Sequence, residues 1–344
     1  MKKLHLSFAF ALFLGLAAPV FAEQAPEDVL KAVVKIRALI PQEARTAASL
    51  GTERVGHGVL IDSKGLILTT GYLILESETV EVTGPEGKVV QAAFVGYDHV
   101  TGFGLLRTRT PLNVEPMKLG LSSKITEGDP VMVATYGGTD EAIGARVIIR
   151  QDFVGSWEYL LENAIYTSPP IAEFGGAALI GPDGRLLGIG SLLAQLSIPG
   201  IGSVPCNVFI PIDLLAPILD DLVTAGRPKK PARPWLGIYA EAAHRRVFVM
   251  RVMRGGPADL AGIQADDLIL KVNGIAVEGL GDFYRKVWML GNAGVEVTLS
   301  ILRAAEIRDI TVRSGDRYKF LEQPPQKTIR GPVETSGGFR SSSS

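Results

Sequence analysis

The stretch that decides the fold is IAEFGGAALIGPDGRLLGI, residues 171–189. The adjacent glycines Gly175 and Gly176 permit a tight backbone turn because they lack a Cβ atom. The small and apolar residues that follow, 177–180, are typical of a short buried strand. A Pro-Asp-Gly turn at 182–184 then leads into a second apolar run. The stretch therefore predicts a tight turn followed by a β-hairpin.

The chain from residue 27 to residue 213 repeats this alternation of short apolar runs and turns. Gly and Pro number 39 and 21, and they separate runs rich in Val, Ile and Leu. Because no regular helical pattern comes between these runs, we predict a mainly β domain, a barrel or a sandwich. One helix is predicted at 213–225, capped by Asp213 and stopped by Gly226. The predicted strands are 29–39, 56–62, 65–70, 79–83, 89–98, 104–109, 130–136, 145–151, 164–168, 177–180, 185–191 and 207–212.

A second module follows the first domain, which we place at 23–226. Prolines and basic residues dominate 227–234, a composition that predicts a stiff, extended linker. The module at 235–313 again has a mainly β pattern, and the polar tail at 314–344 is predicted to be disordered. The strands predicted for the module are 235–241, 247–253, 267–274, 296–303 and 307–313, with helices at 256–262 and 282–290.

Residues 1–22 have the pattern of a secretory signal peptide. The basic residues Lys2 and Lys3 precede a charge-free apolar run at 6–20, and small residues precede Glu23, where we expect cleavage. A transmembrane anchor is the alternative, but the apolar run is short for a bilayer-spanning helix. We therefore expect a protein that is periplasmic or otherwise exported, and soluble after cleavage.

Charge and cysteine content narrow the class of protein further. The chain has 35 Lys and Arg against 36 Asp and Glu, a balance that does not favour nucleic-acid binding. Cys206 is the only cysteine, so neither an intrachain disulfide nor a cysteine-paired metal site is possible, and we expect it to be a small, half-buried hydrophobe. We find no metal-binding pattern or phosphate-binding loop, and expect no cofactor.

Five segments of the chain have the pattern and order of known protease motifs: 56–61, 64–69, 95–106, 178–189 and 208–211. Together they resemble the HtrA/Deg family of exported trypsin-like serine proteases with PDZ domains. The resemblance covers roughly residues 55–313. It implies a trypsin-like double β-barrel followed by a PDZ domain, which is a β-sandwich with two helices.

The resemblance also implies where a catalytic triad would lie. In such a triad a serine attacks the carbonyl, a histidine takes its proton, and an aspartate orients the histidine. The family motifs place Tyr72 at the histidine position and Gly102 at the aspartate position. The serine position falls on Gly175 or, counted forward from Thr167, on Gly176. Because a phenol is a poor base at neutral pH and glycine offers no nucleophile, we expect a degenerate protease.

Two features of the chain bear on whether catalysis survives by other means. A relocated triad could use Asp98 and His99 with Ser168, but neighbouring strand residues point to opposite faces, and we expect Asp98 and His99 to be exposed loop residues. Glu173 and Phe174 occupy the turn that would supply oxyanion-hole N–H groups. A carboxylate there opposes a developing oxyanion.

The second module resembles a PDZ domain at 233–238, 254–263 and 266–274. The resemblance implies β-augmentation, in which a peptide C-terminus adds a strand and backbone N–H groups hold its carboxylate. Apolar residues of the predicted helix 282–290 are pocket candidates, although such residues also form ordinary core. The expected peptide-binding residues are Trp235, Leu236, Gly237 and Ile238, with Phe283, Val287 and Leu290 as the pocket.

The function predicted from the sequence is an exported HtrA-like pseudoprotease in envelope protein quality control or regulation. Its PDZ domain would bind protein C-termini or unfolded polypeptide, while the barrel serves as a scaffold, an oligomerisation platform or a polypeptide-binding surface. Two alternatives stay open: an active serine endopeptidase with relocated catalytic groups, and a regulatory subunit of an active HtrA homologue. Family resemblance also implies a homo-oligomer, typically a trimer.

Overall fold

The computed structural model describes residues 27–198, 200 and 202–321. The predicted signal peptide and the last part of the predicted tail lie outside the described residues. Within the described ranges, no helix has both the length and the apolar character needed to cross a membrane.

The first half of the chain forms a closed six-stranded barrel, in the order β1-β2-β3-β6-β5-β4. All neighbours pair antiparallel, and buried aliphatic side chains fill the interior. The strands are β1 (Val33–Leu39), β2 (Glu53–Leu60), β3 (Leu66–Thr70), β4 (Thr79–Thr83), β5 (Val89–Tyr97) and β6 (Phe103–Thr108).

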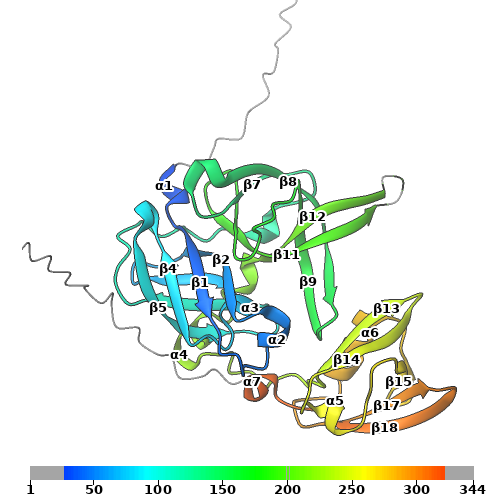
Figure 1. Ribbon diagram of the computed structural model, residues 1–344. Helices are drawn as coiled ribbons and strands as arrows, with labels where there is room; N and C mark the ends of the chain where they lie inside the picture. Colours follow the sequence, from blue (N-terminus) through cyan, green and yellow to red (C-terminus); the bar gives the residue numbers. More distant parts are fainter. Residues whose placement is uncertain (1–26, 199, 201, 322–344) are drawn as a thin grey trace, which may run out of the picture.

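A second closed barrel follows, in the order β10-β11-β12-β9-β8-β7, and it packs beside the first (Figure 1). The β8–β9 hairpin extends from this barrel towards the C-terminal domain (Figure 1). The strands are β7 (Pro130–Ala134), β8 (Ala142–Gly155), β9 (Tyr159–Ser168), β10 (Ala178–Ile180), β11 (Leu186–Ile198) and β12 (Gly202–Pro211).

The C-terminal domain is an antiparallel sheet in the order β13-β14-β15-β17-β18, with β16 paired to β15. The strand β13 lies at one edge, so one side of its backbone is open to a further strand. The elements are β13 (Ile238–Ala243), β14 (Arg246–Val252), α5 (Pro257–Leu260), β15 (Leu268–Val272), β16 (Ile275–Ala276), α6 (Leu280–Trp288), β17 (Glu296–Arg303) and β18 (Glu306–Arg313).

Short helical turns connect the strands. They are α1 (Glu27–Leu30), α2 (Ala47–Leu50), α3 (Gly71–Ile74), η1 (Pro85–Gly87), η2 (Ser122–Lys124), η3 (Gly138–Glu141), η4 (Ile212–Leu214), α4 (Leu219–Ala225) and α7 (Arg317–Phe320). The expectation of a mainly β chain, with a double β-barrel followed by a second, smaller β domain, is confirmed.

The helix predicted at 213–225 is wrong in its first half. The chain forms the short turn η4 and then α4, because Pro217 lacks the N–H group that a continuous helix needs. Asp213 does not cap this helix: its carboxylate accepts hydrogen bonds from the Ser122 and Ser123 N–H groups, at 2.8 Å each. The predicted stop is correct, since Gly226 has φ +73° and donates from its N–H to the Leu222 carbonyl.

The disorder predicted for the tail is wrong for residues 314–321. Gly315 and Trp235 exchange two backbone hydrogen bonds, of 3.1 and 2.8 Å. The turn α7 follows, and its Tyr318 hydroxyl donates to the Asp98 carboxylate at 2.9 Å. Contact with two other parts of the molecule therefore orders a segment whose composition alone predicts a flexible chain.

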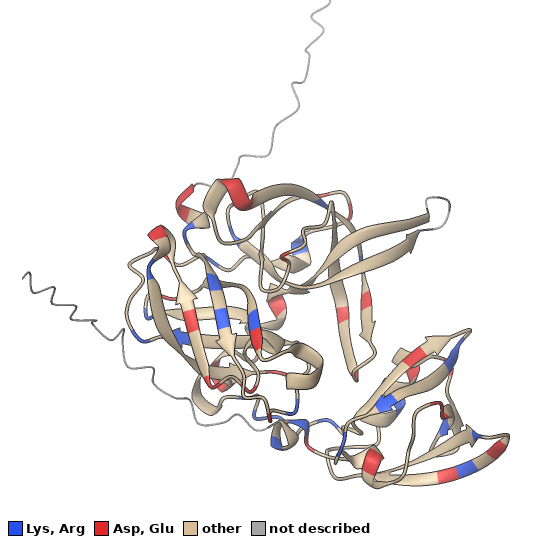
Figure 2. Cartoon of the chain, viewed as in Figure 1, with Lys and Arg blue, Asp and Glu red and all other residues tan. Residues whose placement is uncertain are grey.

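Charged side chains are interspersed over both domains. Figure 2 shows Lys and Arg interspersed with Asp and Glu along the described strands and loops, and several form ion pairs, such as Arg37 with Glu53.

Candidate functional site

The three predicted triad positions lie together where the two barrels meet. Tyr72 belongs to α3, directly after β3, while Gly175 precedes β10 in the other barrel. A Cβ atom on Gly175 would lie 2.6 Å from the Tyr72 hydroxyl oxygen, so the two positions face each other. Gly102 adjoins them through its carbonyl, which accepts a hydrogen bond of 2.7 Å from the Gly71 N–H. The structure therefore brings the three predicted positions together.

Tyr72 is held as a neutral phenol at this place. Its hydroxyl donates to the Ser191 carbonyl at 3.2 Å. Burial raises the pKa of Tyr72 to about 12, so it does not ionise at neutral pH. Arg54 fixes the turn beneath it by donating to the carbonyls of Tyr72 and Leu75, at 2.6 and 3.0 Å. Tyr72 is therefore a neutral, hydrogen-bonded side chain at the position predicted for the histidine.

The loop around Gly175 and Gly176, called the glycine loop below, is packed directly on strand β2. The His57 N–H donates to the Gly175 carbonyl at 2.8 Å, and the Gly176 N–H donates to the Gly190 carbonyl at 2.8 Å. Gly176 has φ +79°, and a Cβ atom there would lie 1.8 Å from the His57 carbonyl oxygen. Only glycine fits this contact, so the loop has a structural reason to keep its glycine.

The imidazole of His57 is buried, with 3% of the residue exposed. Its Nδ1 accepts a hydrogen bond of 3.1 Å from the Tyr136 N–H, and its Nε2 lies 3.4 Å from the Glu173 carboxylate. Burial lowers the pKa of His57, and Glu173 opposes this. Glu173 is thus paired with a histidine of β2.

The structure contradicts the expectation that Asp98 and His99 are exposed, since they are only 2% and 9% exposed. The Asp98 carboxylate accepts hydrogen bonds from the backbone and side chain of Thr101 and from Tyr318, which explains its burial. The His99 ring packs against the rings of Tyr97 and Tyr318, with centroids 4.5 and 4.1 Å away. Burial lowers the pKa of His99 well below its usual value, and the positive charges of Arg317 and Arg227 add to this.

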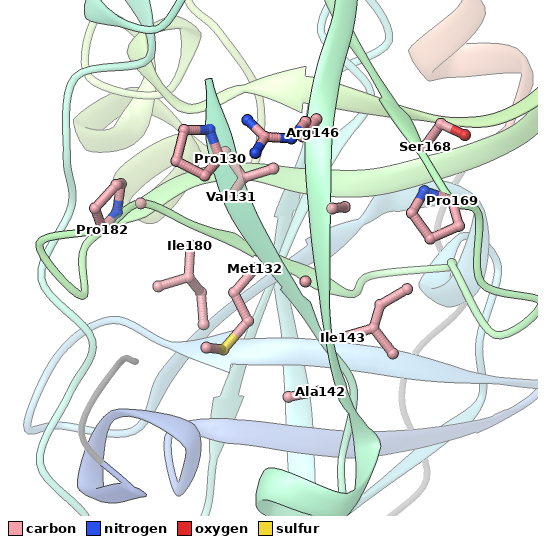
Figure 3. Close-up of a pocket in the computed structure, with 13 residues that line it drawn as sticks. Pro130, Val131, Met132, Ala142, Ile143, Arg146, Ser168, Pro169, Ile180 and Pro182 are labelled. Carbon is pink, nitrogen blue, oxygen red and sulfur yellow. The ribbon is translucent and has the colours of Figure 1, made fainter. Parts of the chain in front are cut away.

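The relocated pair with Ser168 does not form. Neither ring nitrogen of His99 has a hydrogen-bond partner among the described residues. Ser168 instead lines a cavity of about 490 Å³ in the second barrel, where its hydroxyl donates to the Pro205 carbonyl at 3.5 Å. Figure 3 shows Ser168 beside Pro169 at one side of this cavity, which Arg146 also lines. The structure therefore gives no support to a relocated triad.

The remaining candidates for chemistry are metal-ligating groups and the thiol of Cys206. Among residues 27–198, 200 and 202–321, no group of three or more His, Cys, Asp or Glu could hold a metal ion. Cys206 is completely buried rather than half-buried, and this burial raises the pKa of its thiol. A neutral, inaccessible thiol serves as packing.

The predicted carboxylate-binding loop of the PDZ domain holds a carboxylate. Glu158, at the tip of the β8–β9 hairpin, accepts hydrogen bonds from three consecutive N–H groups, those of Leu236, Gly237 and Ile238, at 3.0, 2.6 and 2.8 Å. The Glu158 side chain stands in for the C-terminal carboxylate that the family resemblance implies for this loop. Burial raises the pKa of Glu158, and the three backbone N–H groups oppose that effect.

Further hydrogen bonds to the backbone of the turn between β8 and β9 hold it beside the loop at 236–238. The Ala240 N–H of β13 donates to the Ser156 carbonyl at 2.8 Å, which is the type of bond that an added strand makes with a sheet edge. The Tyr284 hydroxyl of α6 donates to the Gly155 carbonyl at 2.8 Å and accepts from the Glu158 N–H at 3.1 Å. The hairpin tip therefore lies between β13 and α6, the two walls of the predicted groove.

An apolar side chain accompanies the carboxylate. Leu160 of β9 is 5% exposed and belongs to the hydrophobic cluster of the PDZ domain rather than to that of its own barrel. Phe283 and Val287 are members of this cluster, and Leu290 packs against it half-buried. Trp235 lies beside the loop and packs on the Phe320 ring of α7.

The sequence prediction missed Glu158 and Leu160. The segment GSWEYLLE at 155–162 lies between the strands predicted at 145–151 and 164–168, and its Gly-Ser pair could have indicated a hairpin turn. No feature of the sequence indicates that this hairpin contacts a domain that begins near residue 235. Long-range placement of this kind requires the structure.

Comparison with known proteins agrees with this architecture. The pattern of the trypsin-like peptidase domain matches residues 56–189, and that of the PDZ domain matches residues 234–313. The periplasmic serine endoprotease DegP of Salmonella typhimurium is 25% identical over 292 residues, covering 81% of this chain and 60% of DegP. The periplasmic pH-dependent serine endoprotease DegQ of Escherichia coli is 26% identical over 330 residues, covering 85% of this chain and 71% of DegQ. The chain thus spans about 60% of the length of the DegP protein that it matches.

Solved structures show the same fold. A serine endoprotease from Yersinia pestis superimposes with a TM-score of 0.51 and 24% identity, covering 87% of this chain and 99% of that one. The HtrA-type protease AlgW with a decapeptide gives a TM-score of 0.52 at 20% identity, covering 86% and 98%. A trypsin-like peptidase domain followed by a PDZ domain, together with these relatives, supports the assignment of this chain to the HtrA/Deg family.

Proposed function

We propose that this chain is an exported, non-proteolytic member of the HtrA/Deg family that binds protein C-termini through its PDZ domain. The observation that carries this proposal is the convergence of the Leu236, Gly237 and Ile238 N–H groups on one carboxylate. Export is proposed from the pattern of residues 1–22 and from the periplasmic relatives.

The chemistry of the loop suits a peptide C-terminus. A terminal carboxylate and a glutamate carboxylate accept the same N–H bonds, and such charge-assisted bonds are about twice as strong as neutral ones. The edge strand β13 can pair with the backbone of an arriving peptide, as its Ala240 N–H already does with Ser156. Loop and edge strand together form a site that suits the carboxylate and the backbone of a chain end.

The residues where the two barrels meet support the proposal that the chain has no proteolytic activity. Tyr72, Gly102 and Gly175 occupy the positions of base, orienting acid and nucleophile, and none of them can serve in that role. Without the triad, only residual catalysis from binding and the oxyanion hole is expected. The barrel domain is then a scaffold that presents the PDZ domain and its hairpin.

We expect the mature protein to resist labelling by a fluorophosphonate probe and to leave a denatured protein substrate intact. The physical reason is that no serine lies at the place that Tyr72 faces. Mass spectrometry of the labelled protein and gel analysis of the substrate measure this, with the DegP protease as the positive control. Specific labelling of one serine with turnover of the substrate would refute the non-proteolytic assignment, and a Ser168→Ala variant would then test that residue.

We expect a peptide with a free C-terminal carboxylate to bind about tenfold or more tightly than the same peptide with a C-terminal amide. Charge-assisted hydrogen bonds contribute roughly 1.5–3 kcal/mol, which corresponds to that factor or more. Fluorescence anisotropy on the full chain measures both affinities. A Gly237→Val variant should lose binding as well, because Gly237 has φ +79° and a Cβ atom there would lie 3.2 Å from the Trp235 ring. Equal binding of acid and amide would contradict the proposed role of the loop.

A further inference from the structure

We infer that the PDZ groove is controlled by an internal ligand: the tip of the β8–β9 hairpin, residues 153–160, occupies the groove, and a peptide C-terminus must displace it in order to bind. This inference rests on the proposed function, because it assigns a mode of regulation to the same groove. Residues 153–160 are called the hairpin tip below.

The carboxylate of the hairpin tip uses the whole donor set of the loop. Every hydrogen-bond partner that the structure describes for the Glu158 side chain is an N–H group of Leu236, Gly237 or Ile238. Those donors point to one place, so a peptide carboxylate and the Glu158 carboxylate cannot both bind there. The two ligands are therefore mutually exclusive.

The apolar part of the hairpin tip competes in the same way. Leu160 is buried within the PDZ cluster, and Val154 packs against that cluster from the other strand of the hairpin. A Cβ atom on Gly281 of α6 would lie 3.3 Å from Val154 and 3.6 Å from Leu160, so the helix approaches both side chains closely. A C-terminal leucine combines in one residue the carboxylate that Glu158 supplies and the aliphatic side chain that Leu160 supplies.

The contact is suited to release as well as to docking. A buried carboxylate is costly unless it is fully hydrogen-bonded, whereas the same group on an exposed hairpin is satisfied by water. Glu158 is 6% exposed in the docked arrangement, and on release it regains its hydration. At the rim, the exposed ion pair of Arg285 with Asp152 contributes only about 0–1 kcal/mol. The docked state therefore depends on the loop contacts, which a peptide can replace.

Peptide binding and docking of the hairpin tip must affect each other equally, because both use the same groove. If the hairpin tip lowers the affinity of the groove for a peptide, the peptide must weaken docking of the hairpin by the same factor. The hairpin belongs to the second barrel, so a bound C-terminus affects the barrel domain through the release of the hairpin tip. Peptide binding and the attachment of the PDZ domain to the barrel then form one equilibrium.

The experiment compares the full chain with a Glu158→Ala variant, and the probe is a fluorescent peptide that ends in leucine with a free carboxylate. We expect the variant to bind the probe about tenfold more tightly, since the apparent affinity of a groove rises with the fraction of it that is open. The control is Glu162→Ala, which removes an exposed glutamate from the same strand and should bind like the wild type. Equal affinity of wild type and Glu158→Ala would overturn the inference.

Hydrogen exchange separates this inference from the proposed function. Glu158→Ala should increase exchange at the amides of residues 236–238, and saturating peptide should increase exchange at the hairpin tip of the wild type. If neither protein binds the probe while the amides at 236–238 still open in the variant, the peptide-binding function fails but the internal contact stands. If those amides exchange equally in both proteins, the internal contact itself is refuted.

A second variant guards against a simple folding defect. Tyr284→Phe leaves Glu158 in place and removes only the hydroxyl that bonds the Gly155 carbonyl and the Glu158 N–H. It should raise the affinity for the probe by a smaller factor than Glu158→Ala. Unchanged or weaker probe binding in a folded Tyr284→Phe protein would count against the hairpin as the competing ligand.

Discussion

Gly176→Ala is expected to destabilise the barrel domain by about 3 kcal/mol or more, because the new methyl group meets backbone atoms that cannot rotate away. The added Cβ atom would lie 1.8 Å from the His57 carbonyl oxygen, and the residue would have to keep φ +79°. Either the β2 strand or the glycine loop must shift. Each kcal/mol lowers the melting temperature by roughly 2–4 °C in a domain of this size, so we expect a loss of about 6–12 °C.

Differential scanning calorimetry of the full chain measures this effect. Gly144→Ala is the matched control, because Gly144 lies in β8 with φ outside the left-handed region and no atom within 4 Å of an added Cβ atom. The control should melt like the wild type or slightly higher. A Gly176→Ala protein that melted with the control would show that the glycine loop is not packed on β2, and the structural role assigned to it would be wrong.

Arg303→Met is expected to destabilise the PDZ domain by about 3–5 kcal/mol, because it leaves a buried carboxylate without its partner. Asp267 is completely buried, and Arg303 donates to both of its oxygens, at 2.6 Å each. The Gln264 N–H provides the other hydrogen bond described for this carboxylate, at 2.9 Å. That single neutral donor does not replace a bidentate guanidinium.

Chemical denaturation followed by tryptophan fluorescence reports the loss, since Trp235 and Trp288 lie in or beside this domain. The matched control is Arg308→Met, which removes one partner of an exposed ion pair with Glu306 and should cost about 0–1 kcal/mol. The double variant Arg303→Met with Asp267→Leu should regain most of the stability, because no charge remains buried. A single variant as stable as the control would contradict the description of this pair as buried and mutually dependent.

The fold could be predicted from local sequence because its strands are short, apolar and separated by turn residues. The strand predicted at 79–83 coincides with β4, and that predicted at 296–303 coincides with β17. The strands predicted at 145–151 and 164–168 are parts of the longer strands β8 and β9, which form a hairpin. The added residues show no regular alternation of apolar and polar side chains, and Leu160 is buried against the other domain.

Contacts between distant segments explain the remaining errors. Asp98 and His99 read as exposed because their partner Tyr318 comes more than 200 residues later in the chain. The same contact orders the beginning of a tail whose composition predicts disorder. The loop at 236–238 could be predicted to bind a carboxylate because its motif is local, whereas its contact with Glu158 could not, because nothing near Glu158 in the sequence indicates that contact.

The ordered segment after β18 has a consequence for how strongly an internal ligand acts. The linker at 227–234 enters the PDZ domain, α7 leaves it, and Arg227 pairs with Asp316 at 3.2 Å, so both ends of the domain are fastened near the first barrel. Short tethers of this kind keep two groups at an effective concentration on the order of millimolar. A released hairpin tip therefore stays near the groove and competes at that concentration, however dilute the protein is. In the proposed competition, a single dissolved C-terminus displaces the hairpin tip only if its affinity for the groove is high enough. Several C-termini on one partner raise the local concentration of competing ligand and need less affinity each. The double tether thus sets the ligand concentration above which the groove is occupied by peptide.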